Sequence, residues 1–308
     1  MFHTWLVSLP TPSVFGMRAA RIHRHGGPDV ITLEDITLPE PAPGQVLVEV
    51  AATSFNPTET ALRSGVLNDI APVELPLTLG WDVAGTIVAL GKGVQTHAVG
   101  DRVVGWITGA AAEFAVAEAT MVVRAPRTLP LADAAALPLA ALTAWQAIET
   151  TRLRAGERIL INGAGGGIGG FAIQLAKRQG AHVIATASPR SRDAVKRHGA
   201  DEIVDYTTTP LPDADVVLNL VGRPNPELGK LGTRIVTAAA PVEAPPGVSS
   251  THIVARNTPA QLAALVSLVD SGVLTIDIAE RWPLDELATL HRRSEAGDIR
   301  GKVIVVPT

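Results

Sequence analysis

Hydrophobic and polar positions divide the chain into two parts of different texture. From Arg18 to about Ala125, short apolar runs separated by turn residues are typical of β-strands. The clearest runs are QVLVEVAATSF at 45–55, DVAGTIVAL at 82–90 and DRVVGW at 101–106. We therefore expect a compact β domain in this first part of the chain.

One helix interrupts these strands at NPTETALRSG, residues 56–65. Asn56 is suited to the N-cap, Pro57 to the first helical position and Glu59 to the returning bond of a capping box. Gly65 is suited to the left-handed residue that ends a helix. The pattern predicts a short helix directly after the strand at 45–55.

After about Pro126, strands and helices alternate. An alanine- and leucine-rich helix is expected over 131–149, in spite of Pro138. Further helices are expected at 168–180, 192–199, 259–272 and about 284–296, and strands at 158–163, 181–188, 201–206, 215–222, 234–241, 252–255 and 302–308. Apolar strands that alternate with helices favour an α/β fold with a parallel sheet covered on both faces.

The composition excludes several classes of function. The 308 residues suit two domains, 46% of them are hydrophobic, and a net charge of −4 offers no basic surface for nucleic acid or an anionic membrane. The chain contains no cysteine, so it forms no disulfide, no thiolate zinc site and no cysteine nucleophile. Its single tyrosine, Tyr206, limits any mechanism that needs a phenol as the acid.

The chain carries no apolar run long enough to predict a membrane span. Residues 1–16, MFHTWLVSLPTPSVFG, lack a basic start and contain only a short apolar run, so a secretory signal is not expected. We interpret them as a loose N-terminal extension. The absence of cysteine is compatible with the cytoplasmic location that we predict.

The most distinctive motif is INGAGGGIGG at 161–170, which follows a predicted strand and opens a predicted helix. This is the context of a dinucleotide-binding loop, in which backbone N–H groups hold a pyrophosphate. The literal match to G-x-G-x-x-G uses Gly165, Gly167 and Gly170, whereas a frame that starts one residue earlier lies closer to the strand. We predict that earlier frame; a tight turn without a ligand is the alternative. The predicted cofactor-binding residues of the loop are Ala164, Gly165, Gly166, Gly167, Ile168 and Gly169.

The end of the next strand indicates which dinucleotide binds. NAD sites usually place an acid there to hold the ribose hydroxyl groups, but this chain has Ser188, followed by Arg190 and Arg192. A hydroxyl and a guanidinium suit a 2′-phosphate through charge-assisted hydrogen bonds, and Lys177 on the preceding helix adds charge. We predict NADP(H) as the cofactor. The alternative is that the two arginines belong to a solvated surface turn.

Several stretches together resemble the medium-chain dehydrogenase/reductase superfamily, namely PLTLGWDVAGTIVALGKGV, VGDRVVGW, LPLAALTAWQAI and the glycine loop. The closer resemblance, from Met17 to Thr308, is to its zinc-independent quinone oxidoreductase branch. It implies a GroES-like β-barrel catalytic domain, residues 17–125 and 258–308, and a doubly wound Rossmann NADP-binding domain, residues 126–257, between them. It also implies a homodimer formed through Rossmann edge strands, at the stretch HIVA.

Zinc alcohol dehydrogenases of this superfamily hold their catalytic zinc with cysteine, histidine and cysteine or an acid. The matching positions here are Asn56, Trp81 and Leu139, none of which offers a usual zinc ligand. We therefore predict no metal. Because no Lewis acid polarises a carbonyl, the acceptor must already be electrophilic, as quinones and α,β-unsaturated carbonyls are.

The resemblance also implies roles for single residues. Asn56 would lie in the substrate pocket beside the nicotinamide, or cap its helix, or both, and Thr143 would lie near the nicotinamide unless it is an ordinary helix-surface hydroxyl. Tyr206 would flank the adenosine phosphate, or else pack on its own loop. Asn219 and Gly222 would lie at the cofactor cleft, where a strand ends.

Two other functions stay open. An enoyl-thioester reductase of the same superfamily uses a tyrosine after the short helix as proton donor, but RSGVLNDIAPVELPL, residues 63–77, contains none. A non-enzymatic NADPH-binding protein would keep the fold without the reaction, since a fold does not determine a function.

Overall fold

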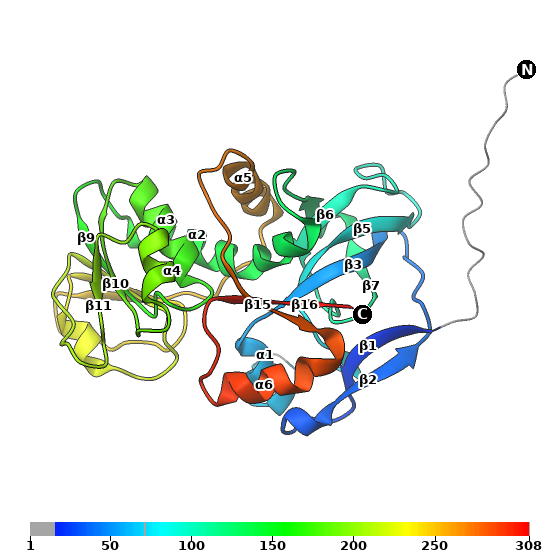
Figure 1. The fold of residues 1–308 in the computed structure, drawn as a ribbon, viewed down its shortest axis with the longest axis horizontal. Helices are drawn as coiled ribbons and strands as arrows, with labels where there is room; N and C mark the ends of the chain where they lie inside the picture. Colours follow the sequence, from blue (N-terminus) through cyan, green and yellow to red (C-terminus); the bar gives the residue numbers. More distant parts are fainter. Residues whose placement is uncertain (1–15, 71, 308) are drawn as a thin grey trace, which may run out of the picture.

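The computed structural model describes residues 16–70 and 72–307, so the predicted N-terminal extension lies outside the described residues except for its last position. Figure 1 shows two lobes side by side, with α2 and α5 near their junction. The helices are α1 (Thr58–Ser64), α2 (Pro138–Thr151), α3 (Gly169–Arg178), α4 (Arg192–Arg197), α5 (Pro259–Asp270) and α6 (Leu287–Glu295). Short 3-10 helices are found at Pro28–Val30, Ala119–Met121, Leu131–Ala136, Pro226–Lys230 and Leu284–Glu286.

One lobe is a β structure built from both ends of the chain. Its larger sheet has the order β15-β16-β3-β5-β6-β8, and β7 pairs with β3 from outside this path. These strands are β3 (Gln45–Phe55), β5 (Asp82–Leu90), β6 (Arg102–Trp106), β7 (Phe114–Glu118), β8 (Val122–Arg124), β15 (Ile278–Pro283) and β16 (Lys302–Val306). A smaller sheet joins β2 (Ile31–Ile36), β1 (Met17–Ile22) and β4 (Leu77–Thr78) in that order. Antiparallel pairing of β16 with β3 brings the C-terminal segment into the N-terminal lobe.

The other lobe contains a six-stranded sheet in the order β11-β10-β9-β12-β13-β14, and all its strands are parallel, as predicted. The strands are β9 (Arg158–Asn162), β10 (His182–Thr186), β11 (Glu202–Val204), β12 (Val216–Asn219), β13 (Arg234–Thr237) and β14 (Ser249–His252). The chain runs outward from β9 through β10 to β11, and then outward on the other side from β12. The strand order therefore reverses between β9 and β12, where doubly wound sheets bind ligands.

The helix predicted over 131–149 is wrong in one respect, because Pro138 divides it. A 3-10 helix covers Leu131–Ala136, and α2 begins at Pro138. Proline has no N–H to donate and clashes with the preceding turn inside a helix, but it suits a first position. This junction lies inside the largest apolar core cluster, which runs from Val104 in the β lobe through α2 to Ile159 in β9.

The predicted edge strand HIVA, residues 252–255, is also displaced. The edge strand is β14, Ser249–His252, which pairs with β13 and exposes all four of its residues. Backbone pairing with β13 decides this strand, whereas the apolar pattern pointed to its C-terminal neighbours. The domain boundaries at 125–126 and 257–258 stay a prediction, because α5 contacts both α2 and β8.

Candidate active site

The glycine loop connects β9 to α3 where the strand order reverses. Gly163 begins it with a φ of +89°, and its N–H donates to Thr186 Oγ1 at 2.8 Å. A Cβ on Gly169 would lie 2.2 Å from the Ala164 carbonyl oxygen, so the start of α3 packs on the loop as only glycine permits. A Cβ on Gly166 would meet nothing closer than the Gly163 oxygen at 3.4 Å. Tight packing at Gly169 and free space at Gly166 favour the earlier of the two frames.

A cleft of about 950 Å³ lies in front of this loop. It is lined by the last residues of β9 and β10 and by the residues that directly follow β12, which is the side of a doubly wound sheet that binds ligands. Five residues that the sequence singled out for the cofactor line it, namely Gly165, Gly166, Ser188, Arg190 and Tyr206. The fold thus brings the glycine loop and the end of β10 to one cleft.

The charges around the cleft favour an anion. Arg190, Arg223 and Arg300 line it, and among the described lining residues the one carboxylate is that of Glu227. Glu227 is itself paired, with Oε1 3.0 Å from Nζ of Lys230. Guanidinium groups in such excess suit a ligand with several phosphate groups.

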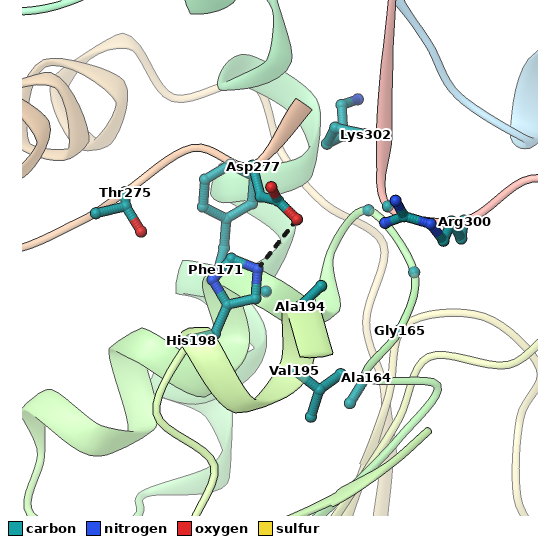
Figure 2. A pocket seen from close by; sticks show the side chains of 14 residues that line it. Ala164, Gly165, Phe171, Ala194, Val195, His198, Thr275, Asp277, Arg300 and Lys302 are labelled. Carbon is teal, nitrogen blue, oxygen red and sulfur yellow. Dashed lines mark ion pairs between the residues drawn. The ribbon is translucent and has the colours of Figure 1, made fainter. Parts of the chain in front are cut away.

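The C-terminal segment forms one wall of the cleft. Arg190 reaches it from the other lobe, with Nη2 donating to the Gly297 oxygen at 3.2 Å and Nη1 3.7 Å from Asp298 Oδ1. Gly301 N–H donates to the Gly165 oxygen at 3.0 Å. Figure 2 shows Arg300 beside the glycine loop. The β lobe therefore contacts the loop directly and covers one side of the cleft.

Lys177 does not reach the cleft, contrary to the prediction. Its Nζ lies 2.8 and 2.7 Å from the two carboxylate oxygens of Asp201, and it also donates to the Ala181 oxygen. The reason is distance along the helix. Lys177 is eight residues beyond Gly169 in α3, and at a rise of about 1.5 Å per residue that places it roughly 12 Å from the loop.

Asn219 and Gly222 lie at the end of β12 but do not line the cleft. Asn219 is fully buried, and its Oδ1 accepts from Asn162 Nδ2 at 2.9 Å while its Nδ2 donates to the Val221 oxygen at 3.1 Å. It therefore braces the ends of β9 and β12 against each other. Gly222 follows in an exposed turn between Val221 and Arg223, which do line the cleft.

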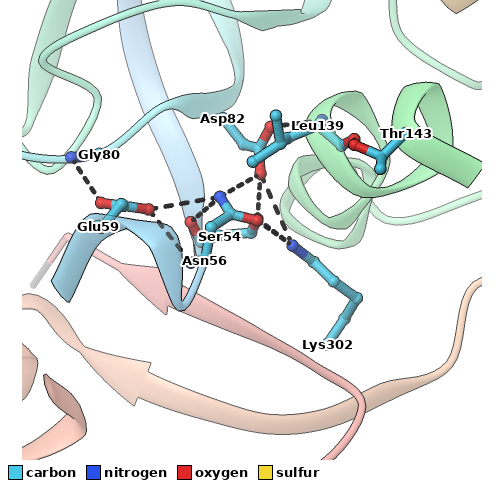
Figure 3. A network of polar contacts seen from close by, with 8 residues as sticks. All are labelled: Ser54, Asn56, Glu59, Gly80, Asp82, Leu139, Thr143 and Lys302. Atoms are coloured by element: carbon cyan, nitrogen blue, oxygen red, sulfur yellow. Dashed lines mark hydrogen bonds and ion pairs between the residues drawn. The ribbon is translucent and has the colours of Figure 1, made fainter. Parts of the chain in front are cut away.

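A buried polar network lies in the β lobe, where Leu139 of α2 also joins it (Figure 3). Lys302, the first residue of β16, is 4% exposed, and its Nζ donates to Ser54 Oγ at 2.7 Å and to Asn56 Oδ1 at 3.1 Å. Asp82, the first residue of β5, is fully buried, accepts from the Ser54 hydroxyl and lies 3.7 Å from Nζ. Its other oxygen accepts from Leu139 N–H in α2 at 2.8 Å.

The Asn56 carboxamide is held on all sides by this network. Its Nδ2 donates to Asp82 Oδ2 at 2.9 Å, to the Ser54 backbone carbonyl oxygen at 3.3 Å and to Glu59 Oε1 at 3.3 Å. Its Oδ1 faces Lys302. The side chain therefore does not cap α1, contrary to one of the two predicted roles. Only half of the capping box forms. Glu59 accepts the Asn56 backbone N–H at 3.1 Å, but the Asn56 side chain accepts no backbone N–H of α1 in return.

Burial perturbs the charged groups of the network. It raises the pKa of Glu59 to about 7, with a further contribution from the nearby Asp82 carboxylate. Burial also lowers the pKa of Lys302, although the Asp82 and Glu59 carboxylates oppose that change. Glu59 is therefore close to half-protonated at neutral pH.

Thr143 lies on the face of α2 that Leu139 also occupies (Figure 3). It is 6% exposed, and its Oγ1 donates to the Leu139 carbonyl oxygen at 2.7 Å. The alternative interpretation as an ordinary surface hydroxyl is therefore wrong, because the hydroxyl is buried near the polar network.

The residues at the expected zinc positions do not fit a metal. An indole and an alkyl group at Trp81 and Leu139 supply no ligand, and the third position, Asn56, turns its oxygen to the Lys302 ammonium. Within residues 16–70 and 72–307, no group of three histidine, aspartate or glutamate side chains could hold a metal ion. We derive no step of the reaction through zinc.

Sequence reasoning missed three basic residues of these sites, Arg223, Arg300 and Lys302. Arg223 follows β12 in a turn whose contacts depend on the tertiary structure. Arg300 precedes Gly301, and both it and Lys302 are distant in sequence from the glycine loop. One signal was available, because Lys302 is a charged residue at the start of the otherwise apolar strand KVIVV.

Three features occur together here: a parallel sheet whose strand order reverses at β9 and β12, a glycine loop at that point, and a β lobe that covers one side of the cleft. They define the two-lobed nucleotide-binding α/β class. Two family models match the chain, "Alcohol dehydrogenase GroES-like domain" over residues 42–127 and "Zinc-binding dehydrogenase" over residues 198–305. The "Chloroplast envelope quinone oxidoreductase homolog" of Arabidopsis thaliana is 31% identical over 94% of this chain and 98% of its own length. The chain belongs to the quinone oxidoreductase-like family of the medium-chain dehydrogenase/reductase superfamily.

Two further comparisons agree with this placement. The "Quinone-oxidoreductase homolog, chloroplastic" of Spinacia oleracea is 40% identical over 193 residues, which is 59% of this chain and 59% of that relative. The crystal structure of Escherichia coli quinone oxidoreductase complexed with NADPH has a TM-score of 0.84 and 26% identity, and the match covers 94% of this chain and all of that one. Within the described residues, no helix is both long and apolar enough to cross a membrane.

Proposed function

We propose that this protein is an NADPH-dependent reductase that transfers hydride to a quinone or an α,β-unsaturated carbonyl without zinc. One observation carries the proposal: the consecutive residues 300–302 link the arginine-lined cleft, which Arg300 lines, to the buried polar network, which contains Lys302. Gly301 is bonded to the glycine loop and Lys302 to Asn56. A dinucleotide in the cleft would therefore end beside the network.

NADPH is the cofactor that the cleft fits. The backbone of Gly165 and Gly166 would receive the pyrophosphate at the start of α3, and Gly166 leaves room for it. Ser188, Arg190 and Tyr206 would surround the adenosine ribose and its 2′-phosphate. No acid stands at the end of β10 to favour the free ribose hydroxyl of NADH.

The cofactor residues proposed here are those of the loop and the cleft. Ala164, Gly167, Ile168 and Gly169 shape the loop, Asn219 braces β12, and Gly222 turns the chain toward Arg223. Lys177 does not belong to the proposed cofactor residues, because the Asp201 carboxylate binds its ammonium.

When bound, NADPH supplies the hydride. The acceptor must then carry negative charge on an oxygen, which hydrogen-bond donors and nearby positive charge stabilise. Asn56 has committed its N–H groups to the protein, so it would act through the network and not as a free donor. Thr143, on the α2 face toward the network, is proposed to lie near the nicotinamide.

The same geometry supports the proposed independence of zinc. The Lys302 ammonium faces the side of Asn56 that a metal would need, and like charges would repel. Addition of zinc or of a chelator should therefore leave the activity unchanged.

An acceptor screen tests the function. NADPH oxidation is measured with ortho- and para-quinones, with enones and with enoyl thioesters, and we expect turnover with the first two classes. Turnover confined to enoyl thioesters would instead identify an enoyl-thioester reductase. That outcome is not expected, because the one tyrosine of the chain, Tyr206, lines the cofactor cleft and does not follow the short helix. Tight NADPH binding without turnover would favour a non-enzymatic protein. Equal affinity for NADPH and NADH, measured by nucleotide fluorescence, would refute the 2′-phosphate assignment.

We also expect a homodimer. The strand β14, Ser249–His252, is an exposed sheet edge whose backbone can pair with a second copy. Light scattering in solution tests this expectation. The cytoplasmic location stays a prediction.

A further inference from the structure

Lys302 is a charged side chain that contacts both the glycine loop and the buried polar network. Its stem lies against the glycine loop, because a Cβ on Gly167 would come within 2.8 Å of Lys302 Cδ. Its ammonium lies in the polar network, bonded to Ser54 and Asn56. It is therefore the one residue whose side chain joins the cofactor loop to the Asn56 carboxamide among the contacts described above.

We propose that Lys302 is a positioning residue of the reductase reaction: its ammonium fixes the Asn56 carboxamide while its stem rests on the glycine loop. The substrate side and the cofactor side are thereby held in one geometry. This inference rests on the proposed function.

The directions of the hydrogen bonds show why an ammonium is needed. Asn56 donates through Nδ2 to Asp82, so its Oδ1 requires a donor on the opposite side, and Lys302 supplies it. Ser54 donates its hydroxyl proton to Asp82, so its oxygen also requires a donor, and Lys302 again supplies it. An ammonium has three protons and no acceptor, which suits this position.

A merely structural role is the competing explanation. Lys302 and Asp82 are both buried, so the ammonium also balances the carboxylate, and loss of one partner leaves an unpaired buried charge. The two roles differ in what happens when both charges are removed together. Charge balance is then restored, but in its present orientation, with Nδ2 toward residue 82, Asn56 still has no donor for Oδ1.

The experiment compares Lys302→Met with the double variant Lys302→Met/Asp82→Asn. Methionine keeps a stem of similar length against Gly167, so the Kd for NADPH, measured by fluorescence titration, should change by less than about threefold. We expect kcat to fall on the order of 10- to 100-fold in both variants, because a small displacement of positioning groups slows the reaction that much. Lys92→Met is the matched control, since Lys92 is exposed in a turn of the β lobe.

The outcomes separate the hypotheses. A wild-type kcat in Lys302→Met would overturn the inference, and so would recovery of kcat in the double variant, which would leave charge balance as the only role. Loss of NADPH affinity with kcat unchanged at saturation would also overturn it, in favour of a cofactor-binding role. If Lys302→Met does not fold, the double variant alone decides. If the wild-type protein turns over no acceptor, it is the proposed function that fails.

Discussion

Glu59 is a buried carboxyl group that takes up its proton more readily in the folded protein than in the unfolded chain. Its pKa is raised from 4.5 to about 7, first by burial and then by Asp82. Its contribution to the free energy of unfolding is therefore full below about pH 4.5 and is lost as the pH rises to about 7. The loss amounts to about 3 kcal/mol for that shift.

We predict that Glu59→Gln removes this pH dependence. The difference in thermal midpoint, variant minus wild type, should rise between pH 5 and about pH 7 and then level off, because the glutamine does not ionise. The pH series is compared with that of Glu286→Gln, an exposed residue. Parallel curves for Glu59→Gln and wild type would show that Glu59 does not titrate in this range.

His291 behaves in the opposite sense. It is fully buried, neither ring nitrogen has a hydrogen-bond partner among residues 16–70 and 72–307, and its ring meets Phe55 edge-on at 5.0 Å between centroids. Burial, with help from the Arg63 guanidinium, lowers its pKa from 6.5 to about 3. The unfolded chain therefore binds the proton more tightly, and the stability that this residue contributes above pH 6.5 is lost as the pH falls.

We predict that His291→Phe resists acid better than wild type. Phenylalanine keeps an aromatic ring beside Phe55 and has no group to protonate. The free energy of unfolding of the variant minus that of wild type should be about 2 kcal/mol larger at pH 5 than at pH 8. Thermal unfolding at both values measures this, and a difference that does not change with pH would contradict it.

At the scale of elements, the turn from β9 to α3 uses its glycines for different purposes. A Cβ on Gly169 collides with the Ala164 backbone at 2.2 Å, whereas a Cβ on Gly166 has space within the protein. Gly166 is open toward the cleft. One glycine therefore serves the packing of the helix, and the other leaves space on the side of the cleft, where we propose that a ligand approaches.

We predict that Gly169→Ala and Gly166→Ala separate these two purposes. Gly169→Ala should destabilise the protein by at least about 1–3 kcal/mol, since backbone has to move. Gly166→Ala should keep the wild-type thermal midpoint and raise the Kd for NADPH about tenfold or more, because its methyl group occupies the pyrophosphate's space. A Gly166→Ala protein with wild-type affinity would refute the assigned frame.

At the scale of the whole molecule, Arg190 joins the two lobes across the cleft. It contacts Gly297 and Asp298 of the C-terminal segment, although both charged side chains of the pair are more than half exposed. A 2′-phosphate at Arg190 would approach the Asp298 carboxylate, and the two negative charges would repel each other. Asp298 would therefore oppose the binding of the cofactor that Arg190 is proposed to favour.

We predict that Asp298→Asn strengthens NADPH binding by up to about fivefold and leaves NADH binding unchanged. The size follows from the ~0.2–1 kcal/mol typical of exposed charge pairs. Asp285→Asn, an exposed acid in the same lobe, is the control. An equal gain for both nucleotides would show that the effect does not depend on the 2′-phosphate.

Local sequence patterns predicted most of the elements. Strands β3 and β5 begin and end at the predicted residues, because each is a largely apolar run between turn signals. The range predicted for the polar edge strand β14 was three residues too late, and β15 was not predicted. Pairing with a neighbouring strand, and not the side-chain pattern, decides where these two strands form. The division of 131–149 at Pro138 was missed because alanine-rich sequence favours helix on both sides of the proline.

The sequence by itself determined the order of the elements, the glycine loop at a strand-to-helix turn and the serine and arginine that follow β10. These depend on neighbours in the chain, whose effects on backbone geometry are local. Only the tertiary structure decided that Lys177 turns away to Asp201, that the Asn56 amide is fully bonded, and that Lys302 joins both sites. Lys302 lies 246 positions from Asn56, so nothing local links them; the antiparallel pairing of β16 with β3 brings them together.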